Sequence, residues 1–131
     1  EKRFKKFLSI PKEKLVPKIY GPEKADMTII GWGSTKGAVL DAIRHLNADG
    51  FKVNYMHFIY INPMDYTEVA SMLENCKNTI IVEGNFSGQF RDIVREKTGF
   101  NIKNTYFKYD GRPFYFQDIY NKVKTIMERG N

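Results

Sequence analysis

The chain has 131 residues, enough for one domain of ordinary size, and 42% of them are hydrophobic, which excludes a disordered chain. Its single cysteine excludes a disulfide framework and any four-cysteine iron–sulfur or zinc site built from this chain alone. No apolar run approaches the roughly 18 residues of a membrane span and no signal peptide opens the chain, so we expect a cytoplasmic protein without membrane contact. Because the first residue is Glu1 and not Met, we expect a processed product or an excised piece.

The net charge of +6 is distributed unevenly along the chain. Residues 1–24 hold eight basic and three acidic residues, whereas residues 25–131 hold thirteen basic and twelve acidic ones. A nucleic-acid-binding surface is usually a basic face of the folded domain, but here the excess lies in a leading segment punctuated by prolines. We therefore expect a basic lead-in or linker over residues 1–24, a folded domain over residues 25–131, and no nucleic-acid partner.

Strand patterns begin within the lead-in. Leu15–Tyr20 is a candidate edge strand, since Pro17 is tolerated at the edge of a sheet but not in its centre. The remaining strand patterns are short apolar or aromatic runs, at Met27–Gly31, Phe51–Phe58, Asn78–Glu83 and Asn104–Tyr109.

Helix patterns follow each of these four strands. The apolar stripes at helical spacing are Val39, Leu40, Ile43 and Leu46; Val69, Met72, Leu73 and Cys76; Phe90, Ile93 and Val94; and Ile119, Val123 and Ile126. We expect Ser34 or Thr35 to cap the first helix and Pro63 to open the second. Gly50 and Gly99 are expected to end the first and third helices.

Strands that alternate with helices predict a three-layer α/β/α sandwich around a mostly parallel five-stranded sheet with right-handed crossovers. In such a sheet, ligands bind beyond the carboxyl ends of the strands. Three segments fall at that edge: Gly31–Gly37, Glu83–Gly88 and Asp110–Pro113.

Gly33, Ser34, Thr35, Lys36 and Gly37 form a loop before the first helix. The loop is one residue too long for a dinucleotide fingerprint, and Lys36 precedes Gly37, so it is not a Walker A loop. The helix start beside it could hold a phosphate, or the loop could be a tight turn with a capping hydroxyl. This loop is the basis of the alternative function, a free-standing flavodoxin-like module that binds a small ligand or a nucleotide.

Glu83 and Asn85 lie at the end of the third central strand, where a carboxylate could take part in catalysis. A single carboxylate without a paired acid or a close histidine gives weak support to acid–base chemistry, and the alternative is that Glu83 caps the following backbone turn. We expect His57 to be a buried residue with its hydrogen bonds satisfied, since no nucleophile is suitably spaced. Cys76 is expected to behave as a small hydrophobic residue.

Asp110, Gly111, Arg112 and Pro113 form the most distinctive stretch. Asp-Gly is a turn signal, and the proline restricts the conformation of the arginine before it. The stretch is either a plain turn or an Asp–Arg pair that anchors the turn against a neighbouring domain. Aromatic residues that would suit such an interface surround it: Phe107, Tyr109, Phe114, Tyr115 and Phe116.

Four motifs in this order resemble the C-terminal part of the α subunit of 2-oxoacid:ferredoxin oxidoreductases. They are Ile30–Gly37 (IGWGSTKG), Pro63 at a helix start, Val82–Gln89 (VEGNFSGQ) and Lys108–Pro113 (KYDGRP). The resemblance extends over about Met27–Ile119, and the last motif is most similar to the branch that acts on 2-oxoglutarate or on many 2-oxoacids. The family usually has Glu-Asn-Asn where this chain has Glu83-Gly84-Asn85, which keeps the first and last of these side chains.

The resemblance implies a fold like the C-terminal domain of transketolase with one antiparallel strand, for which residues 15–20 are the candidate. It implies a parent enzyme that decarboxylates a 2-oxoacid on thiamine diphosphate and Mg²⁺, passes electrons through an iron–sulfur cluster to ferredoxin, and transfers the acyl group to coenzyme A. In that family the thiamine site lies between the α subunit's N-terminal domain and the β subunit, and the cluster cysteines lie outside this region. We therefore expect an assembly domain that is inactive alone, binds no cofactor or metal, and has those two as partners, with ferredoxin a partner of the full enzyme.

Arg112→Ala tests the proposed interface turn. Arginine has a planar fork of donors that pairs with a carboxylate or with backbone carbonyls, and losing a partly buried charged hydrogen bond costs about 1.5–3 kcal/mol. We expect looser assembly or a lower melting temperature of the complex, with nearly unchanged turnover per assembled site. Oligomer mass and turnover number are measured side by side. An intact oligomer whose turnover has fallen by orders of magnitude would instead assign Arg112 to a substrate or coenzyme A site.

Overall fold

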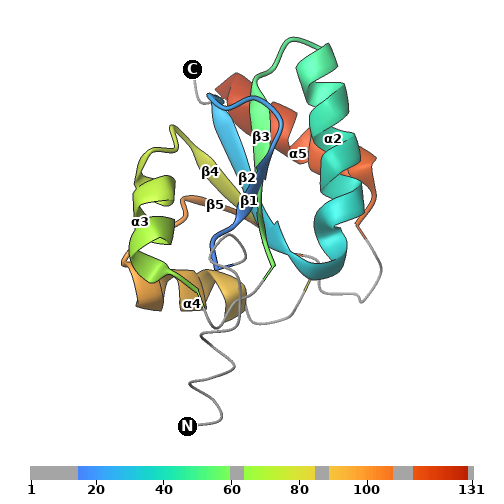
Figure 1. Ribbon diagram of the computed structural model, residues 1–131. Helices are drawn as coiled ribbons and strands as arrows, with labels where there is room; N and C mark the ends of the chain where they lie inside the picture. The colour runs from blue at the N-terminus through green and yellow to red at the C-terminus, as the bar shows by residue number, and fades with distance from the viewer. Residues whose placement is uncertain (1–14, 60–63, 85–88, 108–113, 130–131) are drawn as a thin grey trace, which may run out of the picture.

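The computed structural model describes residues 15–59, 64–84, 89–107 and 114–129. Figure 1 shows a central sheet with helices on both of its faces. The elements in chain order are β1 (Lys18–Tyr20), β2 (Met27–Trp32), the short 3₁₀ helix η2 (Gly33–Thr35), α2 (Lys36–Ala48), β3 (Val53–Phe58), α3 (Tyr66–Glu74), β4 (Thr79–Glu83), α4 (Gln89–Thr98), β5 (Asn104–Phe107) and α5 (Phe116–Arg129). None of the helices in these ranges is long and apolar enough to cross a membrane.

The sheet has five strands in the order β1-β3-β2-β4-β5. The pairs β3–β2, β2–β4 and β4–β5 are parallel, whereas β1 is antiparallel to β3, with Ile19 opposite Met56. The predicted fold is therefore confirmed, and its edge strand is the Lys18–Tyr20 part of the segment expected to form it.

β2 lies in the middle of the sheet because it is apolar on both faces. Ile29 and Ile30 are fully buried, although successive side chains of a strand point to opposite faces. Ile29 belongs to the core under α2 and α5, and Ile30 to the core under α3 and α4. Burying both faces supplies most of the hydrophobic stabilisation, at about 1.5–3 kcal/mol for each large apolar side chain.

The glycine signals mark the ends of two helices, whereas the start of the second helix needs a correction. Gly50 and Gly99 have φ angles of +95° and +76°, which confirms them as the residues that end α2 and α4. The second helix begins at Tyr66 and not at Pro63, which lies outside the described residues. The Asp65 carboxylate caps this helix by accepting from the Glu68 backbone N–H at 3.2 Å.

Cys76 follows the end of α3 instead of belonging to the helix. Its thiol is half-buried and donates a hydrogen bond to the Met72 carbonyl at 3.4 Å. Burial raises the pKa of this thiol, so it stays protonated near neutral pH and packs as a small side chain.

Gly31→Ala and Gly37→Ala are expected to change the free energy of unfolding in opposite directions. A Cβ at residue 31 would lie 3.1 Å from Thr35 Oγ1 and 3.2 Å from the Tyr55 hydroxyl, both held in place, whereas a Cβ at residue 37 meets nothing within 4 Å. We expect Gly31→Ala to lose about 1–2 kcal/mol through overpacking, and Gly37→Ala to gain up to about 1 kcal/mol through helix propensity. Urea unfolding of both variants measures this. Equal effects would mean that the contacts around Gly31 relax freely.

Candidate functional site

The carboxyl ends of β2, β3 and β4 meet at one edge of the sheet, where α2 and α3 begin (Figure 1). This carboxyl edge receives the Gly33–Gly37 loop after β2 and Glu83 at the end of β4. Asn85 and the Asp110–Pro113 turn lie outside the described residues. The structure thus brings the first two predicted segments to the same edge, on neighbouring strands.

The loop after β2 forms one short turn and then α2. Gly33 has a φ of +71°, a left-handed conformation that favours glycine. The Thr35 hydroxyl is buried and donates to the Trp32 carbonyl at 3.2 Å, and no side-chain hydrogen bond caps α2 from this position. The expectation that Thr35 caps the helix is therefore wrong, because its hydroxyl closes the preceding turn instead. The side chain of Ser34 is outside the description.

Tyr55 and His57 form a polar pair on β3 directly beside this loop. Burial raises the pKa of Tyr55 to about 12, so its phenol keeps the proton, and the hydroxyl is hydrogen-bonded to His57 Nδ1 at 2.8 Å. Burial, with a smaller contribution from the charge of Lys36, lowers the pKa of His57, which favours the neutral ring. His57 is half-buried and its Nδ1 has a hydrogen-bond partner, which is close to the buried, hydrogen-bonded residue that the sequence predicted.

Two lysines converge on Tyr20 at the same edge. The Nζ atoms of Lys18 and Lys36 lie 5.1 and 5.0 Å from the centre of the Tyr20 ring. A hydrogen bond from Lys36 is the main cause that lowers the pKa of the Tyr20 phenol, with further help from the charge of Lys18. The Tyr20 ring also stacks on Tyr55, with ring centres 6.2 Å apart. A positively charged cluster therefore joins β1, β3 and the start of α2.

Glu83 is 2% exposed at the end of β4, and its Oε1 accepts a hydrogen bond from the Phe90 backbone N–H at 2.6 Å. Phe90 is the second residue of α4, whose first N–H groups have no partner within the helix. The carboxylate therefore supports the segment after β4 and the first turn of α4. Glu83 therefore supports the backbone, as in the capping alternative. The N–H that donates to it belongs to α4 and not to the turn before the helix.

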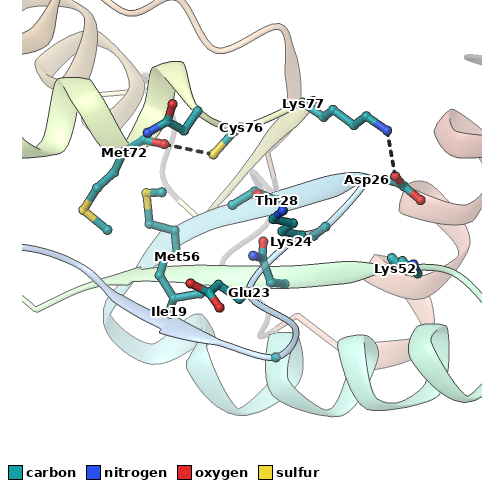
Figure 2. A pocket seen from close by; sticks show the side chains of 14 residues that line it. Ile19, Glu23, Lys24, Asp26, Thr28, Lys52, Met56, Met72, Cys76 and Lys77 are labelled. Carbon is teal, nitrogen blue, oxygen red and sulfur yellow. Dashed lines mark hydrogen bonds and ion pairs between the residues drawn. The ribbon is translucent and has the colours of Figure 1, made fainter.

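A groove of about 1040 Å³ opens at the opposite, amino edge of the sheet. Figure 2 shows Met56, Met72 and Cys76 on one side of it and Lys24, Lys52 and Lys77 on the other. Asn54 also lines the groove; its side-chain N–H donates to the Pro22 carbonyl at 2.9 Å, and its Oδ1 is buried without a hydrogen-bond partner. Lys77 is paired with Asp26 at 3.2 Å.

Sequence reasoning missed both the groove and the tyrosine–lysine cluster. The sequence holds a weak signal for the cluster, because Tyr55 and His57 are two residues apart and share one face of β3, as Lys18 and Tyr20 do on β1. The groove has none, because its walls come from the β1–β2 turn, the strand starts and the end of α3. Within the described ranges, no three His, Cys, Asp or Glu side chains gather closely enough to hold a metal ion.

Comparison with known proteins identifies the family. The family described as pyruvate:ferredoxin oxidoreductase core domain II matches residues 25–119. The α subunit of 2-oxoacid:ferredoxin oxidoreductase 1 from Aeropyrum pernix is 34% identical over 99% of this chain, and the chain spans 21% of that subunit.

Two solved structures have the same fold. A 2-oxoglutarate:ferredoxin oxidoreductase from Magnetococcus marinus, with 2-oxoglutarate, coenzyme A and succinyl-CoA bound, matches with a TM-score of 0.81 and 34% identity over 95% of this chain and 22% of its own. The α chain of a probable 2-oxoacid ferredoxin oxidoreductase from Thermoplasma acidophilum matches with a TM-score of 0.61 and 31% identity over 86% of this chain and 97% of its own. The chain therefore belongs to the core domain II family of pyruvate:ferredoxin oxidoreductase, and it is similar to part of the α subunits of 2-oxoacid:ferredoxin oxidoreductases.

Proposed function

We propose that this chain is the C-terminal assembly domain of the α subunit of an enzyme that oxidises a 2-oxoacid. The observation that supports it most is the TM-score of 0.81, at 34% identity over 95% of the chain, to the oxidoreductase that binds 2-oxoglutarate, coenzyme A and succinyl-CoA. The parent enzyme would release CO₂ from the 2-oxoacid, transfer the acyl group to coenzyme A and pass the electrons to ferredoxin in the cytoplasm. The free-standing flavodoxin-like module is not favoured, because the relatives are subunits of oxidoreductases.

The polar side chains at the carboxyl edge support an assembly role. Glu83 accepts from the backbone of α4, Thr35 donates to the carbonyl of Trp32 at the end of β2, and His57 Nδ1 is hydrogen-bonded to the Tyr55 hydroxyl. Each of these groups holds a neighbouring segment in place, whereas a general acid or base needs a free position toward a substrate. The Gly33–Gly37 loop, Glu83 with Asn85, and the Asp110–Pro113 turn would then shape a contact surface.

The chemistry would be supplied by other parts of the enzyme. An iron–sulfur cluster needs several cysteine thiolates, and this chain has one cysteine. The described residues likewise offer no cluster of carboxylates for the Mg²⁺ of thiamine diphosphate. These groups do not fit this domain, so we assign them to the N-terminal domain of the subunit and to the β subunit.

Reconstitution tests the proposal. This chain alone, supplied with thiamine diphosphate, Mg²⁺, coenzyme A and a panel of 2-oxoacids, is expected to reduce neither ferredoxin nor a viologen dye. The full α subunit together with the β subunit is expected to do so, with 2-oxoglutarate in the panel. Turnover by this chain alone would refute the assembly role, and failure of the full enzyme with every 2-oxoacid would refute the activity.

His57 gives a pH test of the structural role. Its pKa is lowered in the folded chain, so between that value and about 6.5 the unfolded chain binds more protons than the folded one. The free energy of unfolding should therefore rise with pH through this window and level off above it. In His57→Asn, which cannot titrate, this contribution to the rise should be lost. Urea unfolding of both proteins between about pH 5 and 7.5 measures it, and parallel curves would contradict the role assigned to His57.

A further inference from the structure

Large apolar side chains are exposed at the carboxyl edge although every face of the sheet is covered. Trp32, at the end of β2, is 40% exposed, and Ile59, one residue beyond β3, is 44% exposed. Trp32 pairs with Phe58 across the two strands, and Ile59 directly follows Phe58 at the same edge. The indole packs on the buried Phe90 ring, with ring centres 6.1 Å apart, so one side of Trp32 contacts the core while another part stays exposed.

Two cations at the same edge form no ion pair with an acidic side chain of the described residues. Lys18 pairs across the sheet with His57 at the end of β3, and Lys36 begins α2. The ion pairs of the described residues are Arg44–Asp41, Lys77–Asp26 and Arg91–Asp92, and none of them involves these two lysines. Both ammonium groups lie within 5.1 Å of the centre of the Tyr20 ring, so the two positive charges are close together. We call Lys18, Trp32, Lys36 and Ile59 the carboxyl-edge patch.

The lead-in reaches the domain at this edge. The Leu15 carbonyl accepts a hydrogen bond of 2.8 Å from the Asp65 backbone N–H at the start of α3. The Aeropyrum pernix subunit is about five times as long as this chain, which spans 21% of it. If this chain is the C-terminal domain, the polypeptide that precedes it is continuous with β1, whose Lys18 belongs to the patch.

A second copy of this chain is a poor occupant. In a symmetric dimer the same patch would lie on both sides of the interface. The patch has two lysines and no carboxylate, so such a dimer would bring like charges together. An occupant that neutralises these lysines has to be acidic as well as apolar.

We propose that the carboxyl-edge patch is the docking surface for the preceding domain of the same subunit, which inserts an apolar side chain against Trp32 and Ile59 and presents carboxylates to Lys18 and Lys36. This inference rests on the proposed function, since it needs a longer α subunit. It adds the location of the contact and the chemistry of the partner.

Hydroxyl-radical footprinting of the full subunit tests the contact without relying on activity. Trp32 is the only tryptophan of this chain, so its oxidised peptide is read directly by mass spectrometry. We expect its oxidation rate to fall about tenfold in the full subunit relative to this chain, as for a side chain buried at an interface core. Ile19 is the internal control, because it is 37% exposed on β1 at the groove side, and its rate should not change.

Binding between the two halves of the subunit adds the energetic test. The α chain from Thermoplasma acidophilum, 97% of which this fold covers, supports production of the domain as a separate chain. Trp32→Ser, Ile59→Ser and Lys36→Glu are each expected to raise the Kd for the N-terminal half about tenfold or more. Matched controls are Ile19→Ser and Lys52→Glu, which alter exposed side chains at the groove and should change Kd less than about twofold.

The results distinguish a failure of the docking surface from a failure of the proposed activity. Equal oxidation of Trp32 in the full subunit and in this chain would overturn the inference, whatever the variants do. Protection that appears only when the β subunit or a second copy is added would also overturn it, because the occupant would be different. An inactive full enzyme in which Trp32 is protected would instead refute the proposed activity and leave the docking surface standing.

Discussion

The pairing of β2 with β3 on one side and β4 on the other is the constraint on which the rest of the structure depends. Parallel neighbours need crossover connections, and right-handed crossovers put α2 on one face of the sheet and α3 on the other. Both faces of β2 are then buried, as Ile29 and Ile30 require. The same pairing brings three carboxyl strand ends to one edge, so the Gly33–Gly37 loop, Glu83 and the end of β3 lie on one side of the molecule.

The buried polar groups at that edge hold secondary-structure elements together. Glu83 ties β4 to α4, Thr35 closes the turn between β2 and α2, and Tyr55 holds His57 on β3. A buried polar group without a partner costs about 1–3 kcal/mol, so these bonds explain how polar side chains are tolerated inside the domain. A rigid edge of this kind suits a domain that other parts of an enzyme pack against.

The two edges of the sheet have different surfaces. The amino edge has a groove in which Lys77 is already paired with Asp26. The carboxyl edge has exposed Trp32 and Ile59 together with Lys18 and Lys36, which have no acidic partner among the described residues. Exposed apolar side chains at the same edge as unpaired charges are typical of a surface that a partner covers. The groove, which is large enough for a ligand, lies at the opposite edge of the sheet.

The sequence by itself determined the alternation of strands and helices, the glycine helix ends and the edge strand, because apolar period, glycine conformation and proline tolerance are local properties. The antiparallel direction of that strand was implied only by the family resemblance. The sequence left two roles open for Glu83, catalysis or capping of the backbone, and the hydrogen bond that Glu83 accepts from the Phe90 N–H is of the second kind. It did not predict that α3 begins at Tyr66 with Asp65 as its cap, since a cap depends on which side chain reaches a free backbone N–H. Only the tertiary structure decided that the Thr35 hydroxyl turns back to Trp32 and that Lys18 and Lys36 meet over Tyr20, because residues far apart in sequence become neighbours only when the strands pair.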